Sequence, residues 1–434
     1  MAGLQHFGYF FSRGFGPQAW GRSDWDWGHD WTKPDLYQQS VRTLEQAGMD
    51  LVIAEDAISL GNPSTLDLRI RQAYGGPKHD PLLLAPYLFA ATSHIGIAPT
   101  VNAGFTPPYL AARQFSTLAH LSGDRFGVNV VTDTGSARHA GLAPLPHDAA
   151  YDRAEEWLQL VRRLWHSWGS GFIGDPTDWT FADGDALDAF HHEGAYFTAD
   201  GPLNALPLDS DPIVVSPGGS GRGLAFAGTH SDVQLALAPL SAAAVRDYRA
   251  RVLSAAAEAG RAAEALRILF VLKPEIVSSA AEADRVVDAS RHPSDDDLRT
   301  AAIAWSSDSE TDLLALDLDA PIPAGTFGDH VSAGTIRGLV GDTPDAPLRT
   351  LLERKARKGR VASREGFVGT ADEFADFIEE LGADADNDGI IFSGDLHPAQ
   401  VYRMLGDLVP VLRRRGLLRR EYGAGGIRQN LFDF

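Results

Sequence analysis

Short apolar runs alternate with amphipathic stretches along most of the chain, and this alternation predicts strands that are each followed by a helix. The runs are continuously apolar rather than alternating, which is typical of parallel strands covered on both faces. We expect eight strands, at residues 6–11, 50–54, 95–101, 126–132, 212–216, 233–237, 267–272 and 389–392.

Helical patterns follow most of these strands. In residues 35–49, apolar side chains recur at helical spacing from Leu36 to Ala47. Residues 149–168 carry acids in their first turns and arginines later, an order that suits the helix dipole. Further helices are expected at residues 108–121, from Leu224 onward, and at residues 242–260 and 399–417.

Eight strands that alternate with helices favour a closed (β/α)8 barrel, the TIM barrel of the α/β class, over an open doubly wound sheet. We expect one domain over residues 1–434. Two segments break the repeat, at about 169–211 after the fourth helix and about 291–365 between strands seven and eight. Both are longer than ordinary connections, so we expect insertions that roof the mouth of the barrel.

Composition and charge exclude several classes of protein. The 434 residues include no Cys, which excludes disulfides, thiolate nucleophiles and iron–sulfur clusters. The net charge of −20 repels phosphate backbones and argues against a nucleic-acid partner. No stretch approaches the roughly 20 apolar residues that span a bilayer, and the first residues lack a signal-peptide pattern. We therefore expect a cytoplasmic protein without membrane contact.

Polar residues follow several predicted strands at their carboxyl ends, the face at which barrel enzymes carry their active sites. Glu55 and Asp56 follow the second strand, Asn102 the third, and residues 132–134 the fourth, while Ser216 ends the fifth. A single carboxylate at such a position caps the next helix about as often as it serves a site. Several polar positions on one rim favour a functional site.

A glycine-rich loop at residues 217–223 (Pro-Gly-Gly-Ser-Gly-Arg-Gly) leads into a predicted helix. Such a loop can turn backbone N–H groups toward an anion, and the helix start adds favourable partial charge. Ser220 and Arg222 offer a hydroxyl and a cation. The loop is neither a Walker A motif nor a complete GxGxxG motif, and a plain strand-to-helix turn also explains glycines. In a barrel, however, it favours a phosphorylated cofactor or substrate over a dinucleotide held in Rossmann fashion.

Residues 97–113 (IAPTVNAGFTPPYLAAR) and 117–132 (TLAHLSGDRFGVNVVT) resemble the bacterial luciferase-like flavin monooxygenases. The branch is that of the nitrilotriacetate, dibenzothiophene-sulfone and dimethyl-sulfide monooxygenases. Further matching segments cover most of the chain in the right order, at residues 151–157, 194–204, 217–223, 367–376 and 412–422.

The resemblance implies a luciferase-like barrel that uses reduced FMN (FMNH2) supplied by a separate NAD(P)H:flavin reductase. With O2, it would oxidise a small organic substrate, for which heterocyclic, sulfur-containing and nitrogen-containing molecules are candidates. It also implies a homodimer or homotetramer. Two alternatives remain open: oxygen-dependent cleavage of a flavin-like substrate, as in riboflavin lyases, and flavin binding without catalysis.

The flavin contacts of the family carry over to individual positions. Asp56 matches the acid after strand two, and Asn102 stands where relatives carry a hydroxyl residue. His147 and Tyr151 match a His and a Tyr four residues apart that contact the flavin or its phosphate, and Ser220 matches the serine of the phosphate loop.

Substrate contacts do not carry over, because relatives have Ala-Arg-Asn-Phe-Gly after strand four where this chain has Ala-Arg-His-Ala-Gly at 137–141. We therefore assign no catalytic acid or base. Asn102, together with Asn129 and Thr132, can supply the few fixed hydrogen bonds that a flavin ring needs.

Two patterns that imitate metal sites are set aside. Residues 384–395 carry acids at positions 1, 3, 5 and 12 of a calcium loop, but position 12 is Asp rather than Glu, and the segment also predicts a turn into the last strand. His191 and His192 have no third ligand at a useful spacing. We expect no bound metal.

Overall fold

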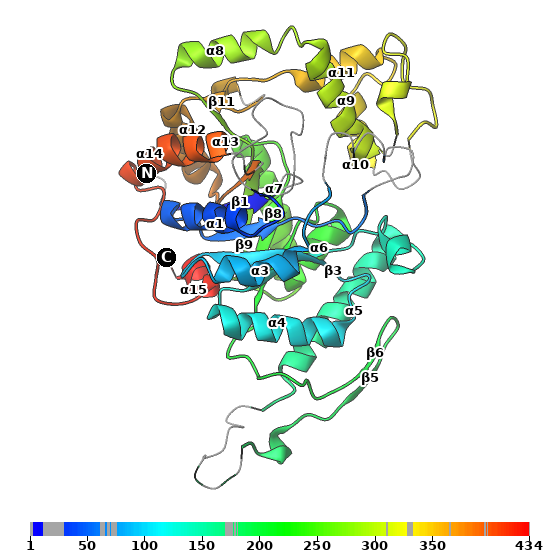
Figure 1. The fold of residues 1–434 in the computed structure, drawn as a ribbon, viewed down its shortest axis with the longest axis vertical. Helices are drawn as coiled ribbons and strands as arrows, with labels where there is room; N and C mark the ends of the chain where they lie inside the picture. The colour runs from blue at the N-terminus through cyan, green and yellow to red at the C-terminus, as the bar shows by residue number, and fades with distance from the viewer. Residues whose placement is uncertain are drawn as a thin grey trace.

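A closed barrel of eight parallel strands forms the centre of the molecule (Figure 1). The computed structural model describes residues 3–11, 30–60, 76–169, 181–309, 311–327, 333–363, 366–394 and 398–433, and the single residues Leu66, Ile70, Thr177, Trp179 and Leu396. Around the barrel the strands are β1 (His6–Phe11), β2 (Leu51–Ala54), β3 (Gly96–Asn102), β4 (Gly127–Val131), β7 (Ile213–Ser216), β8 (Val233–Ala236), β9 (Arg267–Leu272) and β12 (Gly389–Gly394). The predicted TIM barrel is confirmed.

Helices surround the barrel and bury their apolar faces against it. They are α1 (Asp35–Ala47), α3 (Pro81–Phe89), α4 (Pro108–Ser122), α5 (His147–Trp165), α6 (Gly221–His230), α7 (Ala242–Glu258) and α12 (Ala371–Ala385). One large core lies between strands and helices, and a second, smaller core joins side chains such as Leu51, Ile53 and Leu235 with Ile427 of α15 (Ile427–Phe432). Because none of the surrounding helices contributes to this second core, it fills the barrel interior.

The predicted helix over residues 399–417 is interrupted. The structure has α13 (Pro398–Arg403), a π-helical turn at Met404–Leu408 and α14 (Val409–Arg414). Pro410 has no N–H group to bond one turn back, which removes one bond of a regular α-helix at this point.

The first insertion forms an antiparallel hairpin, β5 (His191–Glu193) and β6 (Thr198–Asp200). Glu156 of α5 accepts the N–H of Phe197 at 2.9 Å, and Ser116 of α4 donates to a backbone carbonyl of the insertion. The hairpin projects away from the barrel (Figure 1). In the part of this insertion that the structure describes, the expectation of a roof over the barrel mouth is wrong, because its backbone polar groups are bonded to the outside of α4 and α5.

The second insertion is helical, with α9 (Asp295–Ser309), α10 (Ala333–Val340) and α11 (Leu348–Ala356). These helices lie together at the same end of the molecule as α8 (Ala280–Ala289), at the top of the view (Figure 1). Their small core consists of Leu298, Ala302, Leu313, Leu339, Leu348 and Leu352. The assignment of one domain to the whole chain stays a prediction.

A buried ion pair joins the two ends of the chain at the amino ends of the strands. Asp50, which is 1% exposed, accepts the backbone N–H of Phe7 at 2.9 Å and pairs with Arg419 at 2.5 Å. Among the described residues, no helix is both long and apolar enough to cross a membrane.

Candidate active site at the carboxyl ends of the strands

The loop between β7 and α6 folds tightly back on itself. Ser220 is the N-cap of α6, and its Oγ accepts the N–H of Gly223 at 3.0 Å. A Cβ at Gly218 would lie 2.6 Å from the Tyr151 hydroxyl oxygen and 2.8 Å from the Gly223 Cα. A side chain at Gly218 therefore does not fit, so the backbone can approach Tyr151 closely only with glycine at this position.

His147 and Tyr151, one turn apart on α5, reach this loop. The Nε2 of His147 lies 3.3 Å from the Ser220 Oγ, and the His147 and Tyr151 rings meet edge-on at 5.2 Å. Burial raises the pKa of Tyr151, and hydrogen bonds to Thr132 and Ser220 oppose this only in part. The Tyr151 hydroxyl is therefore a protonated donor at neutral pH. The structure brings His147, Tyr151 and Ser220 together, as the resemblance implies.

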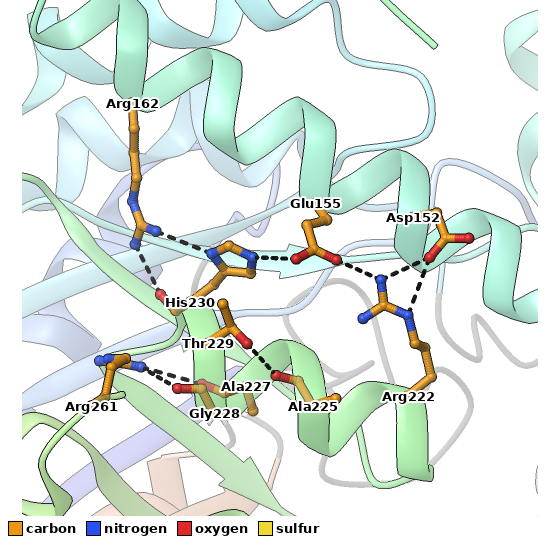
Figure 2. Close-up of polar contacts among 10 residues, drawn as sticks. All are labelled: Asp152, Glu155, Arg162, Arg222, Ala225, Ala227, Gly228, Thr229, His230 and Arg261. Carbon is orange, nitrogen blue, oxygen red and sulfur yellow. Dashed lines mark hydrogen bonds and ion pairs between the residues drawn. The ribbon is translucent and has the colours of Figure 1, made fainter. Parts of the chain in front are cut away.

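Arg222 does not present a free cation to the loop. Its guanidinium lies 2.8 Å from the Asp152 carboxylate and 2.6 Å from that of Glu155, both on α5 (Figure 2). Burial acts to raise the pKa of Glu155, but hydrogen bonds from Arg222 and His230 outweigh it and lower that pKa. The charge that the sequence offered to a phosphate is thus balanced by two carboxylates.

The same network continues to His230 (Figure 2). The Arg162 guanidinium contacts His230 Nδ1 at 3.2 Å, and His230 Nε2 lies 3.3 Å from Glu155. A guanidinium can only donate, so Nδ1 accepts and the ring proton sits on Nε2. Burial lowers the pKa of His230, which favours this neutral form. The network holds α6 against α5 and thereby fixes the start of α6.

Asp56 and Asn102 line a cavity of about 290 Å³ at the carboxyl ends of β2 and β3. Its walls also include Thr100 and the apolar side chains Leu82 and Phe105. Burial raises the pKa of Asp56 to about 6, although Lys78 acts in the opposite direction. A carboxyl group with this pKa changes its charge close to neutral pH.

The side-chain amide of Asn102 forms hydrogen bonds with two backbone groups of the protein. Its Nδ2 donates to the Asp133 carbonyl at 2.8 Å, and its Oδ1 accepts the N–H of Gly104 at 2.7 Å. It therefore shapes the cavity wall by joining the ends of β3 and β4. Thr132, at the same end of β4, bonds to Tyr151. The end of β4 thus links the cavity with the glycine-rich loop.

A buried amide stands behind the cavity without a full set of partners. Asn129 on β4 is 3% exposed, and its Nδ2 donates to the Thr100 Oγ at 2.8 Å. Its Oδ1 has no partner among the described residues. An unsatisfied buried acceptor is costly and calls for an explanation, and Asn129 stands next to Thr100, which lines the cavity.

A larger cavity, of about 780 Å³, lies at the opposite end of the barrel, lined by Asp232, Arg261 and Arg428. Arg428 pairs with Asp232 at 3.0 Å, and Arg261 donates to carbonyls after α6 such as that of Ser231. These charges hold α15 on the amino ends of the strands. Since barrel enzymes react at the carboxyl ends, we place the site at the smaller cavity.

Sequence reasoning did not single out Gln234 or Thr100. Gln234 is a fully buried amide within β8 whose Nε2 donates to the Gly218 carbonyl at 2.9 Å. The sequence did contain one indication of a special role for Gln234, because a polar amide inside an apolar strand must have hydrogen-bond partners. Thr100 likewise stands within an apolar strand, and only the structure shows that it faces the cavity.

Comparison with known proteins agrees with this geometry. A family model described as luciferase-like monooxygenase matches residues 15–383. Dibenzothiophene-sulfone monooxygenase from Rhodococcus erythropolis (strain XP) is 30% identical, over 98% of this chain and 96% of that protein. Nitrilotriacetate monooxygenase component A from Aminobacter aminovorans is 26% identical, over 93% of this chain and 90% of that protein.

The fold also matches solved structures. A riboflavin lyase, solved with modified FMN and its substrate riboflavin, superposes with a TM-score of 0.81 at 23% identity, over 99% of this chain and 96% of that one. At this identity the likeness concerns the fold alone. The family match and the first relative together span nearly the whole chain. The chain therefore belongs to the luciferase-like monooxygenase family, and it is an oxidoreductase of that class.

Proposed function

We propose that this protein is a two-component monooxygenase that binds reduced FMN (FMNH2) and uses O2 to oxidise a small organic substrate. The observation that carries the proposal is that a glycine-rich loop with three polar side chains lies on the same rim of the barrel as a cavity that has an unsatisfied buried amide behind its wall. His147, Tyr151 and Ser220 belong to the first part, and Asp56 and Asn129 to the second.

The loop fits a phosphate. The N–H groups of Gly221 and Arg222 open α6, and the first donors of a helix have no acceptor within that helix. The hydroxyls of Ser220 and Tyr151 stand beside them. The glycines at 218 and 223 let the loop fold against Tyr151, whereas a Cβ at Gly219 or Gly221 would meet no atom within 4 Å, so the backbone there is open to a ligand. These groups would hold the FMN phosphate through neutral donors.

The cavity fits the ring of a flavin. Its volume of about 290 Å³ lies at the lower end of the range for small-molecule sites. Asp56 and the second N–H of the Asn102 amide would hold the polar edge of the ring, with the Asn129 Oδ1 behind them, while Leu82 and Phe105 supply apolar surface. When bound, reduced flavin would supply the electrons that activate O2 for transfer of one oxygen atom to the substrate.

The reductase and the substrate class come from the relatives. One of them is named as component A of its monooxygenase, which supports a separate NAD(P)H:flavin reductase as partner. Another is named for a heterocyclic sulfone, which supports heterocyclic, sulfur-containing or nitrogen-containing substrates. A homodimer or homotetramer stays a prediction, which light scattering on the purified protein tests.

The test is turnover with a generic flavin reductase, FMN and a panel of substrates that begins with dibenzothiophene sulfone. Oxygen-dependent formation of a product with one added oxygen atom supports the proposal. Conversion of riboflavin to lumichrome would replace it with flavin cleavage. Tight FMN binding without any product, across sulfur and nitrogen heterocycles, would replace it with a flavin-binding role.

A further inference from the structure

Gln234 occupies an unusual place for a polar side chain. It lies on β8 between the buried residues Val233 and Leu235, and its own exposure is 0%. A primary amide in such a position costs free energy unless its polar atoms are bonded. If β8 needed only to fill space, an apolar side chain of similar volume would serve.

The amide is bonded at both ends. Its Nε2 donates to the Gly218 carbonyl at 2.9 Å and to the Tyr248 hydroxyl oxygen at 3.0 Å. Its Oε1 accepts the hydroxyl of Ser216 at 3.1 Å. The Gly218 carbonyl can only accept, so the amide cannot be turned over, and its NH2 group must face the loop.

The bonded carbonyl belongs to the glycine-rich loop of the candidate site. Gly218 is also the residue that the Tyr151 hydroxyl approaches, because a Cβ there would lie 2.6 Å from that oxygen. Gln234 therefore holds Gly218 by its carbonyl, while Tyr151 packs against its Cα. A run of glycines has high conformational freedom, so fixing one of its carbonyls removes a large part of that freedom.

We propose that Gln234 is a positioning residue that holds the 217–223 loop in its phosphate-binding conformation. It does not touch the ligand. It acts through Gly218, and Ser216 and Tyr248 hold its amide in the required orientation. The inference rests on the proposed function, in which this loop binds the FMN phosphate.

The test compares FMN with riboflavin, which lacks the phosphate, by fluorescence titration of wild type and Gln234→Met. Methionine has similar length and fills buried space without a donor. We expect the affinity for FMN to fall roughly 10- to 100-fold, the range seen when hydrogen bonds that support a ligand-binding group are removed. The affinity for riboflavin should stay within about twofold of wild type, because the loop contacts only the phosphate.

Gln5→Met is the matched control. Gln5 is also a buried glutamine, 2% exposed, and it donates to the Ile378 carbonyl at 3.0 Å at the amino end of the barrel. This variant should lose stability but keep the wild-type ratio of FMN to riboflavin affinity. If Gln234→Met does not fold, Tyr248→Phe removes one partner of the amide and should shift the ratio in the same direction by a smaller factor.

The outcomes separate the two proposals. A wild type that prefers FMN, with variants at positions 234 and 248 that keep the full preference, overturns the positioning role alone. A wild type that binds FMN no more tightly than riboflavin overturns the phosphate site of the proposed function. A selective loss of FMN affinity at position 234, absent at position 5, supports the inference.

Discussion

Tyr151 has a buried ring, and its hydroxyl lies against Gly218 and Gly223 of the glycine-rich loop. Burial raises its pKa, so the hydroxyl keeps its proton throughout the neutral range. It can therefore donate to an anion throughout that range. Ser220 also has a structural role, because its side-chain oxygen caps the N-terminus of α6. In the proposed function, the two hydroxyls would act on the same phosphate from different elements.

Replacing both hydroxyls, Tyr151→Phe with Ser220→Ala, should weaken FMN binding by about 1–3 kcal/mol, the range for lost charge-assisted hydrogen bonds. Fluorescence titration measures the change. The matched control is Tyr109→Phe with Ser241→Ala, a tyrosine on α4 and the N-cap serine of α7. Unchanged FMN affinity in the first variant would contradict the phosphate assignment.

Asp56 makes stability depend on pH. Its pKa is about 6 in the folded protein, chiefly through burial, against about 3.9 in an unfolded chain. Between these values the folded state binds more protons, so the free energy of unfolding falls as pH rises through this window, and the full penalty applies above pH 6. Asp56→Asn should stabilise the protein at pH 8 and have no such effect at pH 4, as urea unfolding measures. An equal effect at both pH values would show that this carboxyl titrates normally.

The site residues could be predicted to different degrees. His147, Tyr151 and Ser220 were found through a resemblance, since spacing alone does not show that residues 147 and 220 meet. The ion pair of Arg222 with Asp152 could not be predicted from the sequence, because it depends on how α5 packs on α6. Which partner a charged side chain takes is decided by tertiary packing rather than by local sequence.

At the scale of elements, the glycine-rich loop offers a sharp comparison between neighbouring positions. A Cβ at Gly218 would collide with Tyr151 and Gly223, whereas nothing lies within 4 Å of a Cβ at Gly219. Gly218→Ala should therefore displace the loop and lower FMN affinity at least tenfold, about 1.4 kcal/mol, while Gly219→Ala should leave it unchanged. Isothermal titration with FMN measures both. Equal effects at the two positions would contradict the close packing.

The strands were predicted to within two residues at either end, because a parallel barrel strand must be apolar on both faces and is short. The first insertion was expected over the mouth of the barrel, and its hairpin was not predicted, because sequence does not show which surface an insertion covers. Its position depends on Glu156, which binds backbone N–H groups about 40 residues away. The π-helical turn before Pro410 was also not foreseen.

At the scale of the whole molecule, the Asp50–Arg419 pair joins the second strand region to the last part of the chain. Arg419→Met leaves a buried carboxylate without its cation and should cost about 3–5 kcal/mol of unfolding free energy. Arg349→Met is the control, because Arg349 forms an exposed pair with Asp319, worth about 1 kcal/mol or less. Denaturant unfolding measures both. A cost no greater at 419 than at 349 would contradict a structural role for the buried pair.

The two carboxylates on Arg222 have a consequence for cofactor exchange. A phosphate that faced an unpaired guanidinium would be held strongly and released slowly. Because Arg222 is already paired with Asp152 and Glu155, the described residues of the loop would hold the phosphate of the proposed cofactor through hydroxyl and backbone dipoles, which bind an anion more weakly than a free charge. In a two-component system the flavin arrives from one protein and must depart before the next cycle. If the proposed function holds, weak binding of the phosphate would therefore favour rapid exchange of the flavin between the two proteins.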